Sequence, residues 1–448
     1  MTTFRARKWI LILLGALGTL VAGVLCFVQR RAVGILERHE REFVAKVAAI
    51  RGRDWRRPSL YSDSLPSNAW DFYGPALLAI KNIPTSETMF IPELAEEWVD
   101  GERPNDDEIA LFYDQHKSEI EDLRKGLRSS VVDPGVPYEQ GYQRQLYYFS
   151  DVRRAGSFLS GAIQHSIRIE NHAQALELAI ISLGMAQDAS RGGGSIDESV
   201  RWFVAQQIAA AFRRFYSGYS VRASAFETFA KRLDHLERIS PPIRQIVEVD
   251  ELEIKSALLH ADWSLFKETG YFSVGPGPQP LRPTWRALFS ERLTRVQALD
   301  YLSAYTRDLE EVYRRPPYER SAAAEKIDGR YNKIPNPLTY YQFPSYGRFF
   351  KLQAEAALHL TMLRVATALA WYESEHEAPP AALGELVPRY LLNVPLCPYT
   401  GTPLRYTPGK VWSIGGDRKD NGGVCDEKWA NDVDHEANDV VWYVWRKK

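Results

Sequence analysis

The chain has 448 residues and a formal net charge of −1, because 56 Lys and Arg residues are balanced by 57 Asp and Glu residues. This balance argues against nucleic-acid binding, which favours a strongly basic surface. Aromatic residues make up 12% of the sequence, which argues against disorder. The length predicts two or three domains with ample apolar core.

Residues 9–28 form an uncharged apolar run with basic residues on both sides. As a helix this run reaches about 30 Å, the thickness of the hydrocarbon core of a bilayer. It therefore predicts a transmembrane helix that follows a short basic tail at residues 1–8.

Two other interpretations of this run are a cleaved signal peptide and a lipoprotein signal. The run is longer than the roughly 7–15 apolar residues of a signal-peptide core, and no clear small-x-small cleavage site follows. Leu25 precedes Cys26, where lipoprotein processing needs a small residue. The length of the run, the missing cleavage site and the residue before Cys26 all favour an uncleaved anchor.

Helical periodicity dominates much of the remaining chain. Residues 29–52 are predicted to form a helical stalk, whereas residues 53–105 are mixed and rich in Pro, Trp and Tyr. Helices are predicted to dominate from about residue 106, where Asp106 and Asp107 open the first of them. The later ones are predicted at 140–168, 171–188, 195–216, 226–236, 242–269 and 286–313. The Pro-rich segments 270–285 and 334–346 are predicted to be loops, because proline interrupts a helix. The fold class is therefore mainly α, an irregular helical array behind an N-terminal membrane helix.

Three glycines, residues 192–194, separate two of these helices. A phosphate-binding loop would continue with Lys and then Ser or Thr, which this run does not, so we interpret it as a linker. Ser195 and Glu198 follow with the spacing of an N-terminal capping box.

The C-terminal part combines a helix with extended segments. Residues 349–377 predict one long helix, which Pro379 and Pro380 end. A short helix is predicted at 381–387, followed by extended segments at 404–406, 411–414 and 440–444. The last two are predicted to be strands of a small antiparallel sheet that packs on the long helix.

Several short motifs follow one another in this part. They are Ala368-Leu-Ala-Trp-Tyr372, Pro379-Pro380, Leu383-Gly-Glu-Leu-Val-Pro388, Pro395, Pro398, Gly401-Thr-Pro-Leu-Arg-Tyr406, Ser413-Ile-Gly415 and Asp420-Asn-Gly-Gly423. Over about residues 355–445 the series resembles the globular part of type II secretion major pseudopilins. The resemblance implies an α+β module with a long helix, a helical loop, a small sheet and a final loop that commonly binds calcium. Residues 140–260 are similar to membrane-anchored helical bacterial proteins that carry the same tail, and this similarity implies no activity.

Two features depart from the pseudopilin pattern. Pseudopilins have a Gly-Phe-x-x-x-Glu processing site just before the membrane helix, whereas residues 3–8 read Thr-Phe-Arg-Ala-Arg-Lys. We therefore expect the chain not to polymerise as pilins do. The family usually has Asp-Pro where Cys397-Pro398 stands, which suggests a disulfide between Cys397 and Cys425. Two separate buried thiols are the alternative.

Residues 415–440 are rich in carboxylates and contain four glycines. Calcium takes about six to eight oxygen ligands, and glycine allows the tight turns that bring carbonyl oxygens inward. A solvated acidic loop is the alternative, and the spacing matches no EF-hand. With the resemblance, the predicted calcium ligands are Asp417, Asp420, Asp432, Asp434 and Asp439.

The sequence contains none of the metalloprotease, nucleophile-elbow, phosphate-loop or Cys-x-x-Cys patterns. It therefore favours a non-enzymatic scaffold or protein-interaction role in a bacterial envelope, linked to secretion through its tail. The alternative is an envelope hydrolase acting on cell-wall glycan, whose acid residue the sequence does not select.

Basic residues at both ends of the span hardly decide its orientation. The short N-terminal tail and the later cysteines favour a single-pass protein of the bacterial inner membrane, with its large part periplasmic or extracytoplasmic. The predicted organisation is a cytoplasmic tail (1–8), a transmembrane helix (9–28), a stalk and mixed segment (29–105), a helical domain (106–345) and a pseudopilin-like domain (346–448).

Overall fold

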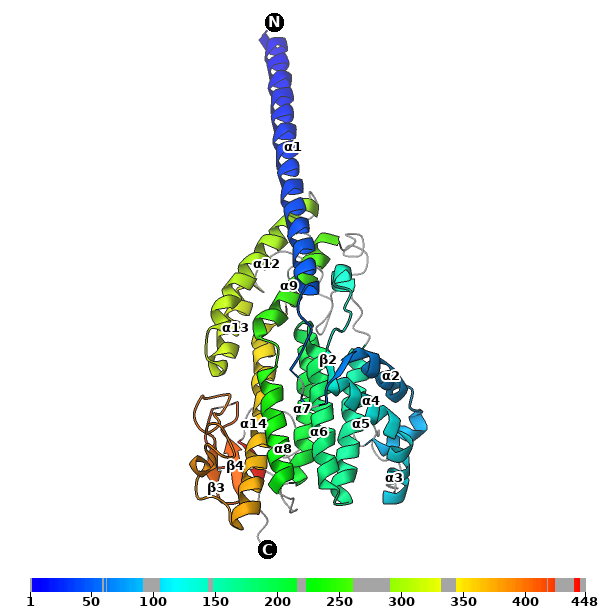
Figure 1. Cartoon of the computed structure of the whole chain (residues 1–448). Helices are drawn as coiled ribbons and strands as arrows, with labels where there is room; N and C mark the ends of the chain where they lie inside the picture. Colours follow the sequence, from blue (N-terminus) through cyan, green and yellow to red (C-terminus); the bar gives the residue numbers. More distant parts are fainter. Residues whose placement is uncertain are drawn as a thin grey trace.

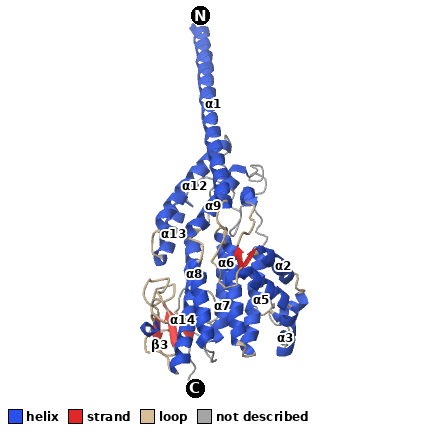
Figure 2. Cartoon of the chain, viewed as in Figure 1, coloured by secondary structure: helices blue, strands red, loops and turns tan. Residues whose placement is uncertain are grey.

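The computed structural model describes residues 2–58, 60–61, 63–91, 105–143, 148–215, 223–260, 291–331, 344–416, 418–423 and 439–443. Within these ranges the protein is mainly helical, with a small antiparallel sheet near the C-terminal end, as the sequence predicts (Figures 1 and 2). The predicted loop at 270–285 and most of the one at 334–346 lie outside the described residues.

The first helix, α1 (Thr2–Arg51), has two halves in different environments. Its N-terminal half stands clear of the body in Figure 1, and Leu20, Val24 and Phe27 are more than half exposed. In the described part of the chain, this is the helix that is long and apolar enough to cross a membrane.

The C-terminal half of α1 packs on α9 (Ile243–His260) and α12 (Glu291–Tyr313). The side chains that make this contact recur every three or four residues and so share one helix face. They are Leu36, His39, Phe43, Val47 and Ile50. The predicted stalk is helical, and this stripe packs it into the body.

Small elements cover one side of the body. They are β1 (Leu65–Asn68), α2 (Trp70–Lys81), the 3₁₀ turn η1 (Thr85–Phe90), α3 (Asp106–Gln115), α4 (Lys117–Arg128), β2 (Ser129–Val131) and the 3₁₀ turn η2 (Tyr138–Gln143). β1 pairs in parallel with β2. A capping box between Asn105 and Glu108 starts α3, where acidic side chains meet the positive end of the helix dipole.

The centre of the body is a set of long helices that lie side by side (Figure 1). They are α5 (Phe149–Arg168), α6 (His172–Ser190), α7 (Ser195–Phe215), α8 (Ala223–Arg238) and α14 (Tyr346–His376). α6 is rich in Ala and Leu and is buried on nearly all sides, as a helix without a polar face must be. Gly184 of α6 allows close approach of α4, because a Cβ there would lie 2.3 Å from a methyl carbon of Leu127.

The C-terminal module is packed into this helical body. α14 contacts α7 and α8, and its later residues belong to the same apolar core as α5 and α6. α13 (Pro317–Tyr331) packs on α14 as well.

Beyond α14 come the 3₁₀ turn η3 (Leu383–Leu386), where a short helix was predicted, and three strands. The strands β3 (Arg405–Thr407), β4 (Lys410–Ser413) and β5 (Val440–Tyr443) form an antiparallel sheet in the order β3-β4-β5. Both predicted strands are confirmed, and α14 packs against β4.

Candidate functional site

Two of the five predicted calcium ligands, Asp420 and Asp439, are described, and they meet at one turn. The buried Asp439 carboxylate accepts hydrogen bonds from the backbone N–H groups of Asn421, at 2.9 Å, and Gly423, at 2.8 Å. Asp420 accepts from the indole of Trp412 at 3.2 Å and from its neighbours Arg405 and Gly422. These donors lower the pKa of Asp420, the backbone N–H of Gly422 most strongly.

Both carboxylates therefore already hold the turn at residues 420–423, in which Gly422 and Gly423 adopt positive φ angles. Asp417, Asp432 and Asp434 lie outside the described residues. Within the described ranges, no three His, Cys, Asp or Glu side chains gather as metal ligands. Calcium binding by this loop stays a prediction.

The predicted disulfide also involves one residue outside the described ranges, Cys425. Its suggested partner Cys397 is buried, and its sulfur lies 3.0 Å from the Ser413 hydroxyl and 3.4 Å from the Ile414 carbonyl oxygen. The pairing stays a prediction.

The glycine run at 192–194 is a packed corner, which the interpretation as a plain linker did not anticipate. Gly192 has a φ of +74°, and a Cβ there would lie 2.3 Å from the Tyr138 hydroxyl oxygen. A Cβ on Gly194 would lie 2.2 Å from Asp250 Oδ1. α7 begins at Ser195, one residue earlier than the predicted capping box implies, and Asp197 accepts from the Gly194 N–H at 2.8 Å.

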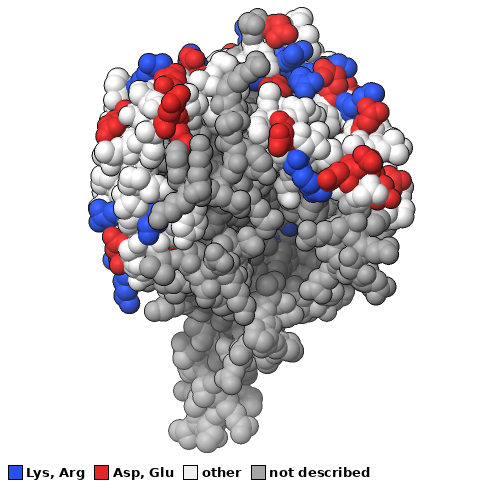
Figure 3. Space-filling view, turned by 90° about the horizontal axis from the view of Figure 1, so that it is seen from below, with Lys and Arg blue, Asp and Glu red and all other residues white. Residues whose placement is uncertain are grey.

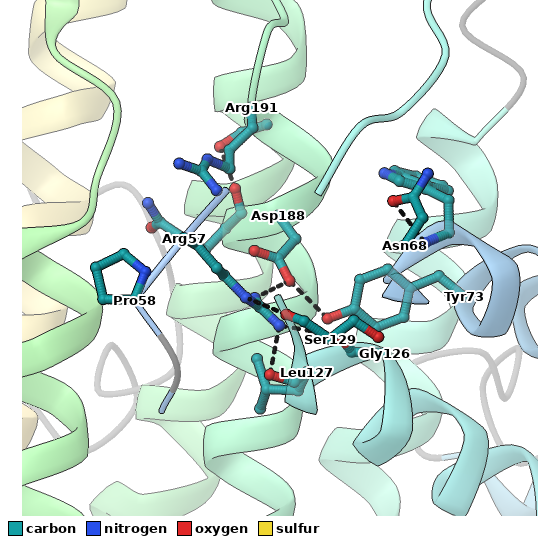
Figure 4. A network of polar contacts seen from close by, with 12 residues as sticks. Arg57, Pro58, Asn68, Tyr73, Gly126, Leu127, Ser129, Asp188 and Arg191 are labelled. Atoms are coloured by element: carbon teal, nitrogen blue, oxygen red, sulfur yellow. Dashed lines mark hydrogen bonds and ion pairs between the residues drawn. The ribbon is translucent and has the colours of Figure 1, made fainter. Parts of the chain in front are cut away.

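A buried ion pair lies beside this corner (Figure 4). Arg57 and Asp188 are both fully buried and bonded to each other. Arg57 also donates to the carbonyl oxygens of Ser129, at 3.1 Å, Gly126, at 2.9 Å, and Leu127. The Tyr73 hydroxyl donates to Asp188 at 2.7 Å, so α2, α4 and α6 meet at one point.

The ion pair has a considerable desolvation cost. Burial by itself would lower the pKa of Arg57. The neighbouring Asp188 and Tyr73 outweigh this effect and raise the pKa above its usual value. Burial raises the pKa of Asp188 despite the neighbouring guanidinium, so pairing only partly offsets the desolvation of this carboxylate. With its two charges neutralised by each other, the pair is suited to fixing the fold and not to chemistry.

Two more buried carboxylates bind the neighbouring helices together. Asp250 of α9 accepts from the backbone N–H of Ser195 at 2.9 Å and from the Tyr346 hydroxyl at 2.6 Å. Burial raises the pKa of Asp250 to about 6, and these two hydrogen bonds limit the rise. Asp328 of α13 accepts from the Tyr305 hydroxyl at 2.7 Å and from the Gly347 N–H at 2.8 Å.

The main candidate binding site is a cavity of about 200 Å³ between α7, α8 and α14, with α6 behind it. Leucines of three helices and Trp202 form apolar walls, and small side chains leave the space between them. The wall residues are Leu183, Trp202, Ala205, Leu233, Leu236, Ala356, Ala357 and Leu360. Trp202 is 3% exposed, so the cavity reaches into the core.

Gln187 of α6 provides a polar end to this cavity. Its side-chain oxygen accepts from Arg201, at 3.4 Å, and from the Ser240 hydroxyl, at 3.2 Å. Arg201 can only donate, so it fixes which way the amide points and leaves Nε2 as a donor. Although Gln187 is only 3% exposed, this Nε2 has no hydrogen-bond partner among the described residues.

The two arginines at the cavity each bond to a carboxylate, although Arg364 Nε has no partner among the described residues. Arg201 bonds to Glu198, with its Nε 2.8 Å from the carboxylate. At the opening, Arg364 bonds to Asp234 and to Glu237, each at 2.5 Å. On the face shown in Figure 3, the described acidic and basic side chains are likewise interspersed.

Comparisons with protein-family models, with curated proteins and with solved structures gave no match. The resemblance of the tail to pseudopilins therefore stays an expectation.

Sequence reasoning missed both the cavity and the buried ion pair. One signal was available in α6, where Gln187 and Asp188 end the largely apolar run at residues 178–186. A polar residue in a helix that is apolar on all sides must be buried and must find a partner. Nothing comparable marked Arg57, which lies in an irregular segment.

Proposed function

We propose that the protein is a membrane-anchored, non-enzymatic envelope protein that acts as a scaffold or protein-interaction component at the bilayer surface. The observation that carries the proposal is the continuity of α1, one helix with an exposed apolar half and a half built into the body. Exposed apolar side chains in such a row are unfavourable in water and favourable in lipid.

Ion pairs add to the apolar stripe that joins α1 to the body. Lys46 lies 2.7 Å from Glu251, and Arg53, just beyond α1, lies 2.9 Å from Glu248. Lys255 of α9 reaches back to Glu42 at 2.9 Å. Burial of α1 against the body starts at Ala32, only four residues after the proposed span at 9–28. The anchor would therefore hold the body close to the lipid headgroups, on the periplasmic or extracytoplasmic side of a bacterial inner membrane.

The cavity supports binding rather than hydrolysis. A glycan hydrolase needs a carboxyl group with a raised pKa in its cleft. Burial raises the pKa of Glu373 to about 7, but Glu373 does not line the cavity. Glu237, which does line it, is 65% exposed and paired with Arg364.

The C-terminal module offers a surface for a protein partner. Leu392 and Leu396, in the segment between η3 and β3, are 62% and 53% exposed. A secretion component is the partner that the pseudopilin resemblance suggests, with calcium as a stabilising ion of the neighbouring acidic loop.

Membrane anchoring can be tested by placing charge in the proposed span. Leu20→Arg combined with Val24→Arg should move the protein out of the carbonate-resistant membrane fraction, because each arginine there costs about 3 kcal/mol. Val44→Arg combined with Ala48→Arg is the matched control, at the same spacing on an exposed face of the same helix beyond the span. Equal membrane retention of both double variants would refute the anchor.

The scaffold role can be tested with a photo-crosslinking residue at Leu396 in native membranes. We expect a discrete crosslinked product that contains a secretion component. The same residue at Leu111, which is 59% exposed on α3, serves as the control. Identical products at both positions, or none at Leu396, would contradict the proposed interaction surface.

A further inference from the structure

We infer that the cavity between α7, α8 and α14 is a binding site for a small, uncharged, apolar molecule that carries a carbonyl oxygen. This inference does not depend on the proposed membrane anchoring or on a protein partner. It rests on the size of the cavity, on its two buried donors without a partner among the described residues, Gln187 Nε2 and Arg364 Nε, and on the pairing of its charges.

The size of the cavity sets the size of the ligand. Engineered cavities of about 150 Å³ with apolar walls stay dry and bind benzene. A cavity of about 200 Å³ therefore accommodates a benzene-sized group with a small polar substituent. The Leu233, Leu236 and Leu360 walls and the indole of Trp202 suit such a group.

The unpartnered donor at Gln187 determines which polar group the ligand must carry. A buried N–H without a partner is costly, and a ligand that accepts its hydrogen bond recovers that free energy. Gln187 Nε2 is such a donor, and the Gln187 oxygen is already used by Arg201 and Ser240. The ligand must therefore supply an acceptor at this end, and a carbonyl oxygen is the simplest one.

The charges exclude an ionised ligand. The two arginines at the cavity, Arg201 and Arg364, face three carboxylates, those of Glu198, Asp234 and Glu237. An anionic ligand would enter a site whose cations are already neutralised. Of the three carboxylates only Glu237 lines the cavity, and it is 65% exposed, so a cationic ligand that enters toward Gln187 would lose its hydration without a lining carboxylate beside it. Desolvating either ion without compensation is unfavourable, so an uncharged ligand is favoured.

The test uses the full-length chain in lipid nanodiscs and three fluorinated probes observed by ¹⁹F NMR. The probes are 4-fluorobenzamide, which has the carbonyl, 4-fluorotoluene, which lacks it, and 4-fluorobenzoate, which is charged. We expect saturable broadening with 4-fluorobenzamide and an affinity for 4-fluorobenzoate that is lower by about tenfold or more.

Two variants locate the binding. Ala357→Leu fills the cavity and should weaken 4-fluorobenzamide binding by about tenfold or more. Ala354→Leu, one turn earlier on the same helix and outside the cavity lining, should leave it unchanged. Gln187→Met removes the donor and should weaken 4-fluorobenzamide binding about tenfold while changing 4-fluorotoluene binding less than about twofold.

Partial unfolding of Gln187→Met would weaken the binding of 4-fluorobenzamide and of 4-fluorotoluene alike. A loss of affinity for 4-fluorobenzamide alone therefore reports on the missing donor. Unsaturable broadening, or the same broadening with Ala357→Leu as with the wild type, would mean adsorption to lipid and would overturn the assignment. An affinity for 4-fluorobenzamide that Gln187→Met leaves unchanged would overturn the role of the amide. Membrane fractionation of the same variants should match the wild type, so failure here is separable from failure of the anchor.

Discussion

Gln187 and Asp188 are neighbours on α6, but their side chains point to two different regions: Asp188 to the buried ion pair, and Gln187 to the cavity. Asp188 points to α2 and α4, where Arg57 and Tyr73 bond to its carboxylate (Figure 4). Gln187 points to α7, α8 and α14, where small side chains leave room. Each side chain keeps one atom without a partner among the described residues, Oδ1 of Asp188 and Nε2 of Gln187.

The difference teaches that an unpaired polar atom indicates a ligand only where there is space for one. Asp188 does not line the cavity, so its free oxygen is a local cost of the ion pair. The free donor of Gln187 borders a volume that a small molecule can fill. Stability should therefore depend strongly on the Asp188 region and weakly on the Gln187 region.

The largest effect is expected from Arg57→Met, which leaves the buried Asp188 without its countercharge. Removing one partner of a buried ion pair costs about 3–5 kcal/mol. The loss should be larger at pH 8 than at pH 5, because a protonated Asp188 does not need the guanidinium. Urea unfolding followed by tryptophan fluorescence measures it. The exposed neighbour Arg56→Met should stay within about 0.5 kcal/mol of wild type, and equal losses would contradict the role of the pair.

A pH-dependent effect is expected from Asp250. Its pKa is raised from 3.8 to about 6, so the folded state binds this proton more tightly than the unfolded state. The resulting stabilisation is complete below about pH 4 and is lost as the pH rises through about 6, up to about 3 kcal/mol. Comparing Asp250→Asn with wild type by urea unfolding from pH 4 to pH 8 isolates this contribution. A constant difference between the two proteins over this range would rule it out.

The packed corner at residues 192–194 should be destabilised by the addition of one methyl group. Gly194→Ala should lower the free energy of unfolding by about 1–3 kcal/mol, because its Cβ would overlap Asp250. Gly329→Ala in α13 is the control, since a Cβ there meets nothing within 4 Å. It should raise the stability by about 0.5–1 kcal/mol. Thermal melts of both variants test the contrast, and a shift of the same sign in both would contradict it.

The smallest effect is expected from Gln187→Met. Its Nε2 is already unsatisfied, so removing the amide sacrifices only the two long hydrogen bonds at its oxygen. We expect a change within about 1 kcal/mol, against several for Arg57→Met. A loss as large as that of Arg57→Met in the same urea titration would show that the cavity side is as tightly constrained as the Asp188 side.

Much of this fold could be predicted from the sequence. Apolar periodicity identified α5 to α9, but it placed the start of the first of them at 140, where the structure has the turn η2 up to Gln143 and α5 only from Phe149. Alternation identified the strands at 411–414 and 440–444. The caps were placed less accurately, since Asp197 rather than Glu198 accepts the N–H that precedes α7. Local patterns define elements well because each element is fixed largely by its own side chains.

The candidate site could not be predicted in this way, because its residues come from four helices and from the segment that follows α8. Gln187, Arg201, Ser240 and Ala357 are brought together by packing, and no spacing in the sequence relates them. The same holds for Arg57, whose partner is 131 residues away. The acidic loop was the most visible motif in the sequence, yet its two described carboxylates serve to hold a turn.

The unbroken course of α1 has a geometric consequence for any partner within the plane of a membrane. Under the proposed anchoring, the direction in which the body faces is set by helical phase, because no hinge lies between the span and Ala32. One residue inserted after Arg30 would rotate the body by about 100° and raise it by about 1.5 Å. Seven inserted residues would raise it by about 10 Å but return it to within about 20° of its original azimuth. Such insertions separate a requirement for orientation from a requirement for distance.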